Sequence, residues 1–270
     1  MSEANAPLKV LVLVKYVPDA QFERRLDGPG NTTDRSDSIL SELDEYAVEA
    51  ALQLTEARGG AKAGNTVTAL TMGPEAAANA VKKCLQMGAS DGVHVTDPAL
   101  AGSDAAATSL ALAAAVRHLG GFDLIVTGMS STDGETSLVP SQLAERLGLP
   151  QLTLLSSVEL DGAAVTGRRD GDTASQTLSA PLPALVSVTD QYDEPRYPNF
   201  KGIIGAKKKK TAVLSLADLG LTAGQVGSAG SWTQVSTADA RPARQAGTII
   251  TDQGDAGVKL VDFLAEQKLL

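Results

Sequence analysis

The apolar run at residues 8–17, LKVLVLVKYV, shows no alternation of apolar and polar positions. This pattern is typical of a strand buried on both faces of a parallel sheet. The segment 41–60 then begins with Ser41 and three acidic residues, repeats apolar residues at helical spacing and ends at two glycines. A capping hydroxyl, an acidic first turn and a terminal glycine predict a helix with Ser41 as its N-cap.

The alternation of strand and helix patterns continues through the first half of the chain. Strand patterns recur at 66–70, 91–95 and 122–128, each followed by a helix pattern, at 73–88, 103–121 and 136–148. Ser103 is the expected cap of the helix at 103–121, and Cys84 lies on the apolar face of the helix at 73–88. Four strands that alternate with four helices predict an α/β fold, a doubly wound parallel sheet with right-handed crossovers.

The pattern changes between residues 153 and 190. Short β-like runs are joined there by Asp-Gly turns at Asp161 and Asp170. Such turns connect antiparallel strands, so we expect added antiparallel strands that extend the sheet.

The last part of the chain differs in composition from both preceding parts. From 211 to 257 it is rich in Gly, Ala, Ser and Thr with little periodicity, and 258–270 is amphipathic. A stretch of that length without structure of its own is disordered or lies against a partner, and we favour the partner. We therefore expect an α/β domain over 1–210, then an extended C-terminal arm and terminal helix over 211–270.

Composition narrows the classes of function. A chain of 270 residues can form one large α/β domain with an appendage, and its net charge of -9 argues against a general nucleic-acid binder. The single cysteine, Cys84, excludes an intramolecular disulfide and a cysteine-based metal site and fits a reducing compartment. Neither a signal-peptide pattern nor an apolar run long enough to span a membrane is found, so we expect a soluble cytoplasmic protein.

The sequence lacks the patterns of a catalytic site. There is no HExxH, no GxSxG and no Cys/His pair, and the acidic pairs lie in turns and helix starts, where capping and solvation account for them. We therefore expect a binding protein without catalytic residues and without a metal.

The segment 127–145, TGMSSTDGETSLVPSQLAE, is the strongest candidate for a ligand site. It leaves a predicted strand through Gly128, passes hydroxyl residues and the Asp133–Gly134 turn, and enters a helix. Amide groups at a helix N-terminus bind phosphate, and ligands of open parallel sheets lie beyond the carboxyl ends of the strands. Because neither GxGxxG nor GxxxxGKS is present, the alternative is that Asp133 and Glu135 form only a turn and an N-cap.

Several stretches together resemble the β subunits of electron transfer flavoproteins, including those associated with nitrogen fixation. They are VLVLVKYVPD, DEYAVEAAL, MGPEAAANAVKKCLQMGASDGVHVTD, GMSSTDGETSLVPSQLAERLGLPQLT and DEPRYPNFKGIIGAKKKK. The resemblance covers residues 8–210 in order. It implies an α subunit that carries FAD, and in the β subunit an AMP, or a second FAD in electron-bifurcating members.

The resemblance also implies which residues contact the nucleotide. In this chain they are Leu13, Ser41, Asp44, Met72, Gly128, Ser131, Thr132, Asp133, Gly134, Glu135, Thr136, Ser137, Leu138 and Val139. The family loop usually reads Gly-Lys-Gln-Ala-Ile-Asp-Gly-Asp, and residues 129–132 here lack its lysine and glutamine. Ser41 stands where asparagine is common, and Leu138 where glutamine is common.

The segment 190–210 resembles the family's docking segment. Its prolines, its aromatic residues and the four lysines from Lys207 to Lys210 predict an exposed loop that docks a redox partner. The implied docking residues are Glu194, Pro195, Arg196, Tyr197, Phe200, Ile203 and Ile204, with Phe200 at the position of a leucine that plugs into the partner.

The resemblance implies an electron carrier. Its partners would be acyl-CoA or other flavin dehydrogenases as donors and a quinone-reducing acceptor, with no direct membrane insertion. The alternative from another class is a stand-alone nucleotide-binding regulatory protein on the same fold. The segment 190–210 and the C-terminal arm favour the carrier, because a lone regulator needs neither.

Overall fold

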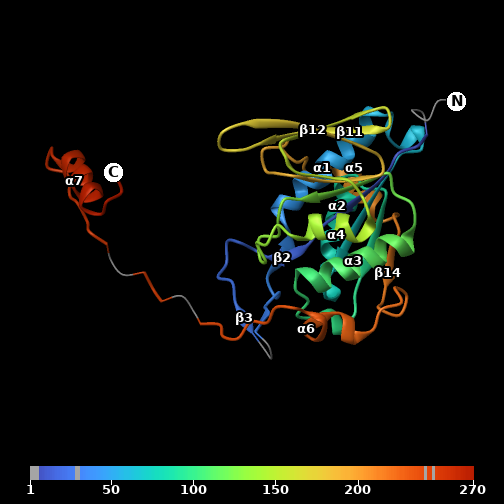
Figure 1. The fold of residues 1–270 in the computed structure, drawn as a ribbon, viewed down its shortest axis with the longest axis horizontal. Helices are drawn as coiled ribbons and strands as arrows, with labels where there is room; N and C mark the ends of the chain where they lie inside the picture. Colours follow the sequence, from blue (N-terminus) through green and yellow to red (C-terminus); the bar gives the residue numbers. More distant parts are fainter. Residues whose placement is uncertain (1–5, 28–30, 240–241, 245–246) are drawn as a thin grey trace. The chain divides into compact units, whose positions relative to one another are not determined.

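A computed structural model describes residues 6–27, 31–239, 242–244 and 247–270. The chain divides into two compact units, residues 1–238 and 239–270. The body, residues 1–238, is built on a seven-stranded sheet of order β14-β7-β6-β1-β8-β13-β9 (Figure 1). Its strands are β1 (Lys9–Leu13), β6 (Thr66–Met72), β7 (Asp91–Val95), β8 (Leu124–Gly128), β9 (Gln151–Leu155), β13 (Ala184–Val188) and β14 (Thr211–Leu214). Each pairing within this sheet is parallel.

Helices cover both faces of the sheet, which confirms the predicted doubly wound α/β class. They are α1 (Glu42–Ala57), α2 (Ala78–Met87), α3 (Ala105–Leu119) and α4 (Val139–Leu147). Successive side chains of β1 point to opposite faces, so Val10 and Val12 pack with α1 and α2, and Leu11 packs with α3 and α4. Cys84 is fully buried on the α1 side, and burial raises the pKa of its thiol, as do the nearby charges of Asp44 and Glu45.

The opening apolar run is two strands and not one. β1 ends at Leu13, and β2 (Tyr16–Pro18) pairs antiparallel with β5 (Ser38–Leu40) outside the main sheet. The backbone N–H of Lys15 donates to the carboxylate of Asp44 at 2.7 Å, so the chain leaves the sheet at that point. Between β2 and β5 lies a small hairpin, β3 (Leu26–Asp27) with β4 (Thr32–Thr33).

Three predicted helix starts were wrong. The helix predicted at 73–88 begins with one 3-10 turn, Glu75–Ala77, and α2 follows only at Ala78. The carboxylate of Asp104, and not Ser103, caps α3 by accepting from the Ala107 N–H at 2.9 Å. Ser103 instead donates its hydroxyl to the Leu100 carbonyl at 2.7 Å. α4 begins at Val139, later than the predicted residue 136, because the chain from 136 to 138 belongs to the loop.

The antiparallel strands do not extend the main sheet as expected. β10 (Ser157–Asp161), β11 (Ala164–Asp170) and β12 (Ser175–Pro181) form a separate three-stranded sheet, which lies at the top of Figure 1. The Asp-Gly turns join these strands as predicted. The inner face of this sheet buries Val158, Val165 and Ala180 in the core cluster of α1, whereas β9 and β13 join the main sheet.

Part of the segment beginning at residue 211 is ordered, contrary to the expectation of an unstructured stretch. β14 is an edge strand parallel to β7, and the short helix α6 (Gly227–Gly230) follows it. Leu214, Leu216 and Val226 are buried in the core cluster of α3. The compact units therefore divide after residue 238 rather than after residue 210.

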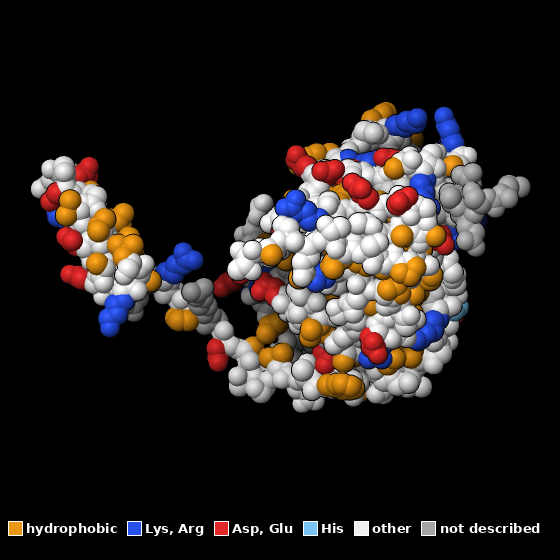
Figure 2. Space-filling model, turned by 45° about the horizontal axis from the view of Figure 1, so that its top comes forward, with side chains coloured by type: hydrophobic (Ala, Val, Ile, Leu, Met, Phe, Trp, Pro, Cys, Tyr) orange, Lys and Arg blue, Asp and Glu red, His pale blue; other side chains and the backbone are white. Residues whose placement is uncertain are grey.

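The unit 239–270 contains one helix among its described residues, α7 (Ala256–Glu266). None of the side chains of α7 is buried within the described structure. No helix in the described residues combines the length and the apolarity that a membrane crossing requires. The face of the body shown in Figure 2 carries acidic and basic side chains interspersed with one another.

Candidate functional site

The predicted nucleotide residues converge beyond the carboxyl ends of three neighbouring strands. Leu13, Met72 and Gly128 are the last residues of β1, β6 and β8, and β1 lies between the other two strands. The chain runs from β1 to one side and returns to the other at β8, which is the topological switch point of the sheet. The side chains of Leu13 and Met72 pack into the α3-side core, so only their backbone groups remain to contact a ligand at the strand ends.

Gly128 permits a close approach of β8 to the start of α1. A Cβ atom at this position would lie 2.4 Å from Asp44 Oδ1 and 3.0 Å from the Leu43 carbonyl oxygen. Any larger residue would therefore displace the first turn of α1. This contact brings the two predicted site residues Gly128 and Asp44 together.

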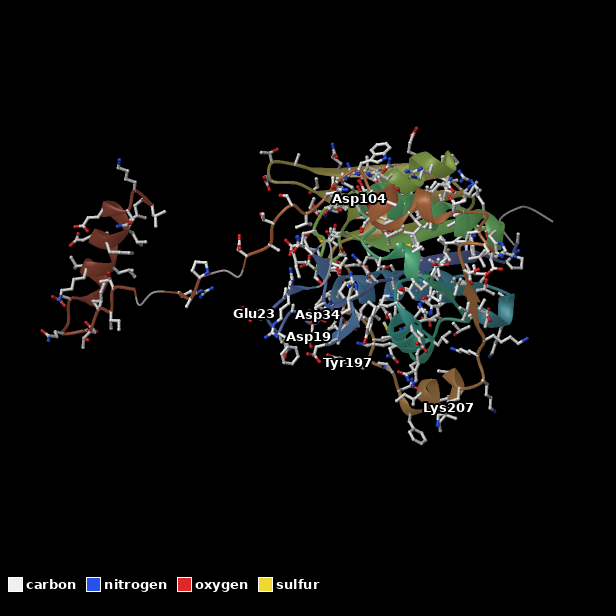
Figure 3. The ribbon with its side chains drawn as sticks, turned by 90° about the horizontal axis from the view of Figure 1, so that it is seen from below. Asp19, Glu23, Asp34, Asp104, Tyr197 and Lys207 are labelled. Atoms are coloured by element: carbon white, nitrogen blue, oxygen red, sulfur yellow. The ribbon has the colours of Figure 1, made fainter. Side chains whose placement is uncertain are left out.

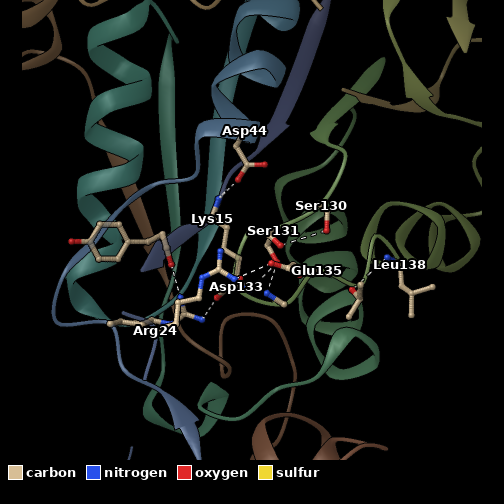
Figure 4. Close-up of polar contacts among 12 residues, drawn as sticks. Lys15, Arg24, Asp44, Ser130, Ser131, Asp133, Glu135 and Leu138 are labelled. Atoms are coloured by element: carbon tan, nitrogen blue, oxygen red, sulfur yellow. Dashed lines mark hydrogen bonds and ion pairs between the residues drawn. The ribbon is translucent and has the colours of Figure 1, made fainter. Parts of the chain in front are cut away.

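Asp44 is a buried carboxyl group in the first turn of α1, next to Gly128. Burial raises its pKa to about 7, although hydrogen bonds from the backbone N–H groups of Lys15 and Gly128 and the charge of Lys15 oppose that shift. The negative charge of Asp133 adds to the rise. Figure 4 shows the Asp44 carboxylate beside the backbone of Lys15, whose N–H donates to it at 2.7 Å.

We expect Asp44→Asn to change how stability depends on pH. Between pH 5.5 and 6.5 the folded protein holds a proton on Asp44 that the unfolded chain releases, because the folded pKa is about 7 against 3.8. The free energy of unfolding therefore falls as pH rises, by about 1 kcal/mol over this unit from this group alone. Urea denaturation at both pH values measures it. The variant is expected to lose that decline, and the same decline in both proteins would contradict the assignment.

Asp133 is the centre of an ionic cluster in the nucleotide loop. Its carboxylate accepts from Lys15 Nζ and from Arg35 Nη2, each at 2.7 Å, and its side chain is only 4% exposed. Burial opposes ionisation, but the charges and hydrogen bonds of Lys15 and Arg35 hold the pKa of Asp133 well below its usual range. Asp133 is thus neither a free turn residue nor the N-cap of α4 (Figure 4).

The cluster changes the net charge that an anion bound at the loop would experience. Glu135 pairs with Arg24 at 2.8 Å, so Lys15, Arg24 and Arg35 together face the two carboxylates of the loop. Sequence reasoning missed these three cations, because they lie about a hundred residues before the loop in the chain. The repulsion expected between a phosphate and the two acids is offset by these partners.

The loop itself holds an unusual backbone. Glu135 and Ser137 have φ values of 50° and 53°, in the left-handed region that non-glycine residues rarely adopt. The N–H of Gly134 donates to Ser131 Oγ at 3.3 Å, and Lys15 Nζ bonds the same hydroxyl at 3.3 Å. The first turn of α4 has no side-chain cap among the described residues, and because Pro140 has no N–H, the amides of Val139 and Ser141 are those available to an acceptor.

Buried oxygens without partners mark the same region. Among the described residues, the buried side-chain oxygens with no hydrogen-bond partner belong to Ser41, Thr71 and Gln142. Ser41 is the N-cap residue of α1 but makes no capping bond, Thr71 is the penultimate residue of β6, and both are 0% exposed. An unpaired buried hydroxyl costs about 1–3 kcal/mol, so two of them, one next to Lys15 and one at the end of β6, fit a polar ligand at the switch point. Gln142 lies in the second turn of α4.

The predicted docking loop is partly helical. α5 (Phe200–Ala206) is capped by Asn199, whose side chain accepts from the Gly202 N–H at 2.8 Å. Tyr197 and Phe200 are 85% and 79% exposed, and Ile203 and Ile204 are also exposed. Figure 3 shows Tyr197 and Lys207 at the periphery of the body. Glu194 is exposed and Pro195 is half-buried.

Two charged side chains of this segment bond to the body. Arg196 binds Glu49 and Glu56 of α1, and although burial opposes ionisation of Glu49, the bonds and charge of Arg196 lower the pKa of that carboxyl. Lys209 donates to the carbonyls of Leu85 and Ala89 at the end of α2, whereas Lys207, Lys208 and Lys210 are exposed. The cationic run therefore offers three and not four free lysines to solvent.

The fold and the site define a doubly wound α/β protein with a group of polar side chains at the switch point of its sheet, where the ligand crevice of this class of fold lies. The family model for the electron transfer flavoprotein domain matches residues 31–219. The chain belongs to the electron transfer flavoprotein family, which confirms the resemblance found in its motifs.

Similar proteins cover almost the whole chain. The electron transfer flavoprotein subunit beta of Mycobacterium leprae is 44% identical over 263 residues, 97% of this chain and 99% of that protein. The subunit of the same name from Megasphaera elsdenii is 32% identical over 96% of this chain and 97% of its own length. The caffeyl-CoA reductase-Etf complex subunit CarD of Acetobacterium woodii is 31% identical over 97% of this chain and 100% of that protein.

Proposed function

We propose that the chain is the β subunit of a heterodimeric electron transfer flavoprotein. It binds AMP in the crevice as a structural ligand and pairs with an α subunit that holds the FAD. The observation that carries the nucleotide is the combination at one switch point of two unpaired buried hydroxyls, an uncapped helix start and the cations Lys15 and Arg35. The subunit itself supplies binding and docking, and the redox chemistry belongs to the flavin.

In this proposal each part of the crevice meets one part of AMP. The phosphate lies on those amides between Asp133 and Val139 that do not already donate within the loop, among them Thr136, Ser137 and Val139. Lys15 and Arg35, which Asp133 holds in place, lie nearby. The hydroxyls of Ser41 and Thr71, which lack a partner in the described residues, form hydrogen bonds to the ligand or to water bound with it. Gly128 keeps α1 close enough to complete the crevice.

The same proposal assigns the electron path. The exposed side chains of Tyr197 and Phe200 dock flavin dehydrogenases such as acyl-CoA dehydrogenases, and the reduced carrier passes electrons to a quinone-reducing acceptor. The three exposed lysines raise the encounter rate with acidic partners more than the affinity. We place the complex in the cytoplasm, without insertion into a membrane.

The nucleotide is tested by counting what the purified heterodimer releases on denaturation. One FAD and one AMP per heterodimer are expected. Two FAD would make the chain a bifurcating-type subunit, and a complex without any nucleotide beyond one FAD would overturn the site.

Gly128→Ala gives a sharper test of the crevice. The added Cβ would meet the Asp44 carboxylate at 2.4 Å, so the start of α1 must shift and the AMP content is expected to fall by about tenfold or more. Gly224→Ala is the matched control, because nothing lies within 4 Å of its added Cβ. Full AMP occupancy in Gly128→Ala at native stability would show that the crevice does not hold the nucleotide.

A further inference from the structure

Arg196 follows the half-buried Pro195 and precedes the exposed Tyr197, and its own side chain points into the body. Its guanidinium Nε and Nη2 donate to the two oxygens of Glu49 at 2.7 and 2.9 Å. Nη1 and Nη2 donate to the two oxygens of Glu56 at 2.6 and 2.9 Å, and the backbone N–H of Arg196 donates to Glu49 at 3.1 Å. The arginine thus binds both carboxylates in bidentate geometry, which fixes its orientation more firmly than a single ion pair would.

The two carboxylates form a receptor on one face of α1. Glu49 and Glu56 are seven residues apart, close to two helical turns, so their side chains lie above one another. Gln53, between them, donates to Glu49 at 3.1 Å and accepts from the Tyr192 hydroxyl at 3.1 Å. Glu49 is 4% exposed, so its charge depends on this partner.

The other end of the segment is fixed to α2. A Cβ atom on Gly202 would lie 2.3 Å from the Gln86 carbonyl oxygen, so α5 rests directly on the backbone of α2. Lys209 donates to the Leu85 and Ala89 carbonyls at 2.8 and 2.6 Å. Residues 197–201, with the exposed Tyr197 and Phe200, therefore lie between two attachments to different helices of the body.

We propose that Arg196 is a positioning residue for partner docking, which holds Tyr197 and Phe200 in their docking arrangement without contacting the partner itself. A segment that is ordered before the encounter does not lose its freedom on binding, so the partner is captured at lower concentration. This inference rests on the proposed docking function of the segment. It reassigns Arg196, which the family resemblance places among the docking contacts, to the support beneath them.

The first test compares Arg196→Lys with Arg196→Gln in the intact heterodimer. Lysine keeps the charge but cannot bind two carboxylates in bidentate fashion, so a positioning role predicts losses in both variants and a role as a charge for the partner predicts a loss only in glutamine. Amide hydrogen exchange of residues 197–206, measured without any dehydrogenase, is expected to accelerate by about tenfold or more in Arg196→Gln. Unchanged exchange in both variants would overturn the inference.

Steady-state kinetics separate binding of the dehydrogenase, reported by KM, from electron transfer, reported by the limiting rate. With an acyl-CoA dehydrogenase as the donor, Arg196→Gln is expected to raise the KM for the heterodimer about tenfold and to leave the limiting rate unchanged. A fall in the limiting rate at constant KM would contradict a positioning role. Glu56→Gln is the mild variant, because Glu56 is half exposed and its removal leaves no buried charge unpaired. It is expected to raise KM about threefold.

A second pair of variants tests the same idea from the other attachment, in case Arg196→Gln fails to fold. Gly202→Ala forces α5 away from α2, whereas Gly205→Ala in the same helix meets nothing within 4 Å. Faster exchange and a higher KM are expected in Gly202→Ala and not in Gly205→Ala. Equal KM values for the two would count against the inference.

Failure of the inference is distinguishable from failure of the docking function beneath it. If Phe200→Ala leaves KM unchanged, the segment does not dock the dehydrogenase and the proposed function fails at that point. If Phe200→Ala raises KM but Arg196→Gln and Gly202→Ala do not, the segment docks without needing its attachments, and the inference alone is overturned.

Discussion

Removing residues 239–270 is expected to abolish stable pairing with the α subunit while the body stays folded. These residues form a compact unit separate from residues 1–238. Their helix α7 exposes apolar side chains at Val258, Leu260, Val261 and Phe263. At about 25 cal/mol per Å² of apolar surface, burial of such a face on a partner supplies several kcal/mol, so its loss is expected to weaken pairing more than a hundredfold.

Sedimentation of the co-expressed subunits measures the pairing, and a thermal melt of the shortened chain checks the body. Val258→Asp with Val261→Asp places charge on the apolar side of α7 and is expected to reproduce the loss. Lys259→Ala is the control, because it removes only an exposed lysine paired with Asp255. A truncated chain that still forms the heterodimer would show that the unit 239–270 does not carry the interface.

Phe200→Ala is expected to leave the melting temperature nearly unchanged and to weaken electron acceptance about thirtyfold. The side chain is 79% exposed, so its loss removes little packing, and surface changes of this kind lie within about 0.5 kcal/mol. An aromatic anchor in a docking interface contributes about 2 kcal/mol or more. A core phenylalanine would instead cost about 3–5 kcal/mol of stability on truncation.

Stopped-flow reduction by an acyl-CoA dehydrogenase, run beside a melt, measures both quantities. Phe22→Ala is the matched control, since Phe22 is another phenylalanine of the body and is 61% exposed. Direct reduction of the flavin by dithionite is expected to stay normal in both variants. A Phe200→Ala protein that melts early and accepts electrons at the native rate would identify Phe200 as a packing residue.

The predicted fold was correct where one local pattern decides the outcome. A short, mostly apolar strand such as residues 124–128 fits the interior of a parallel sheet, and the helix patterns between such strands leave little choice of topology. The predictions were wrong where contacts between residues distant in the sequence determine the structure. β14 becomes a strand because β7 offers an unpaired edge, and residues 211–214 alone are too short to predict it.

The same distinction applies to the site. The loop after β8 follows from the strand order, because ligands of open parallel sheets lie beyond the carboxyl ends of the strands, whereas Asp44 is placed at the site by the family resemblance alone. The ionic cluster of Lys15 and Arg35 around Asp133 could not be predicted, since it joins residues about a hundred positions apart. The orientation of the Arg196 side chain could not be predicted either. An arginine in a polar segment can face a partner or a helix of its own chain, and the sequence does not distinguish the two.

Because Cys84 is buried, the rate at which a thiol reagent labels it measures local opening of the protein. It is the single cysteine of the chain, it is 0% exposed, and its raised pKa leaves little thiolate to react while α2 stays packed. A thiol reagent can therefore label the chain only at the moments when α2 separates from the sheet. Since α5 rests on α2 at Gly202, the labelling rate would register whether an occupied docking segment steadies the helix beneath it, with no introduced probe.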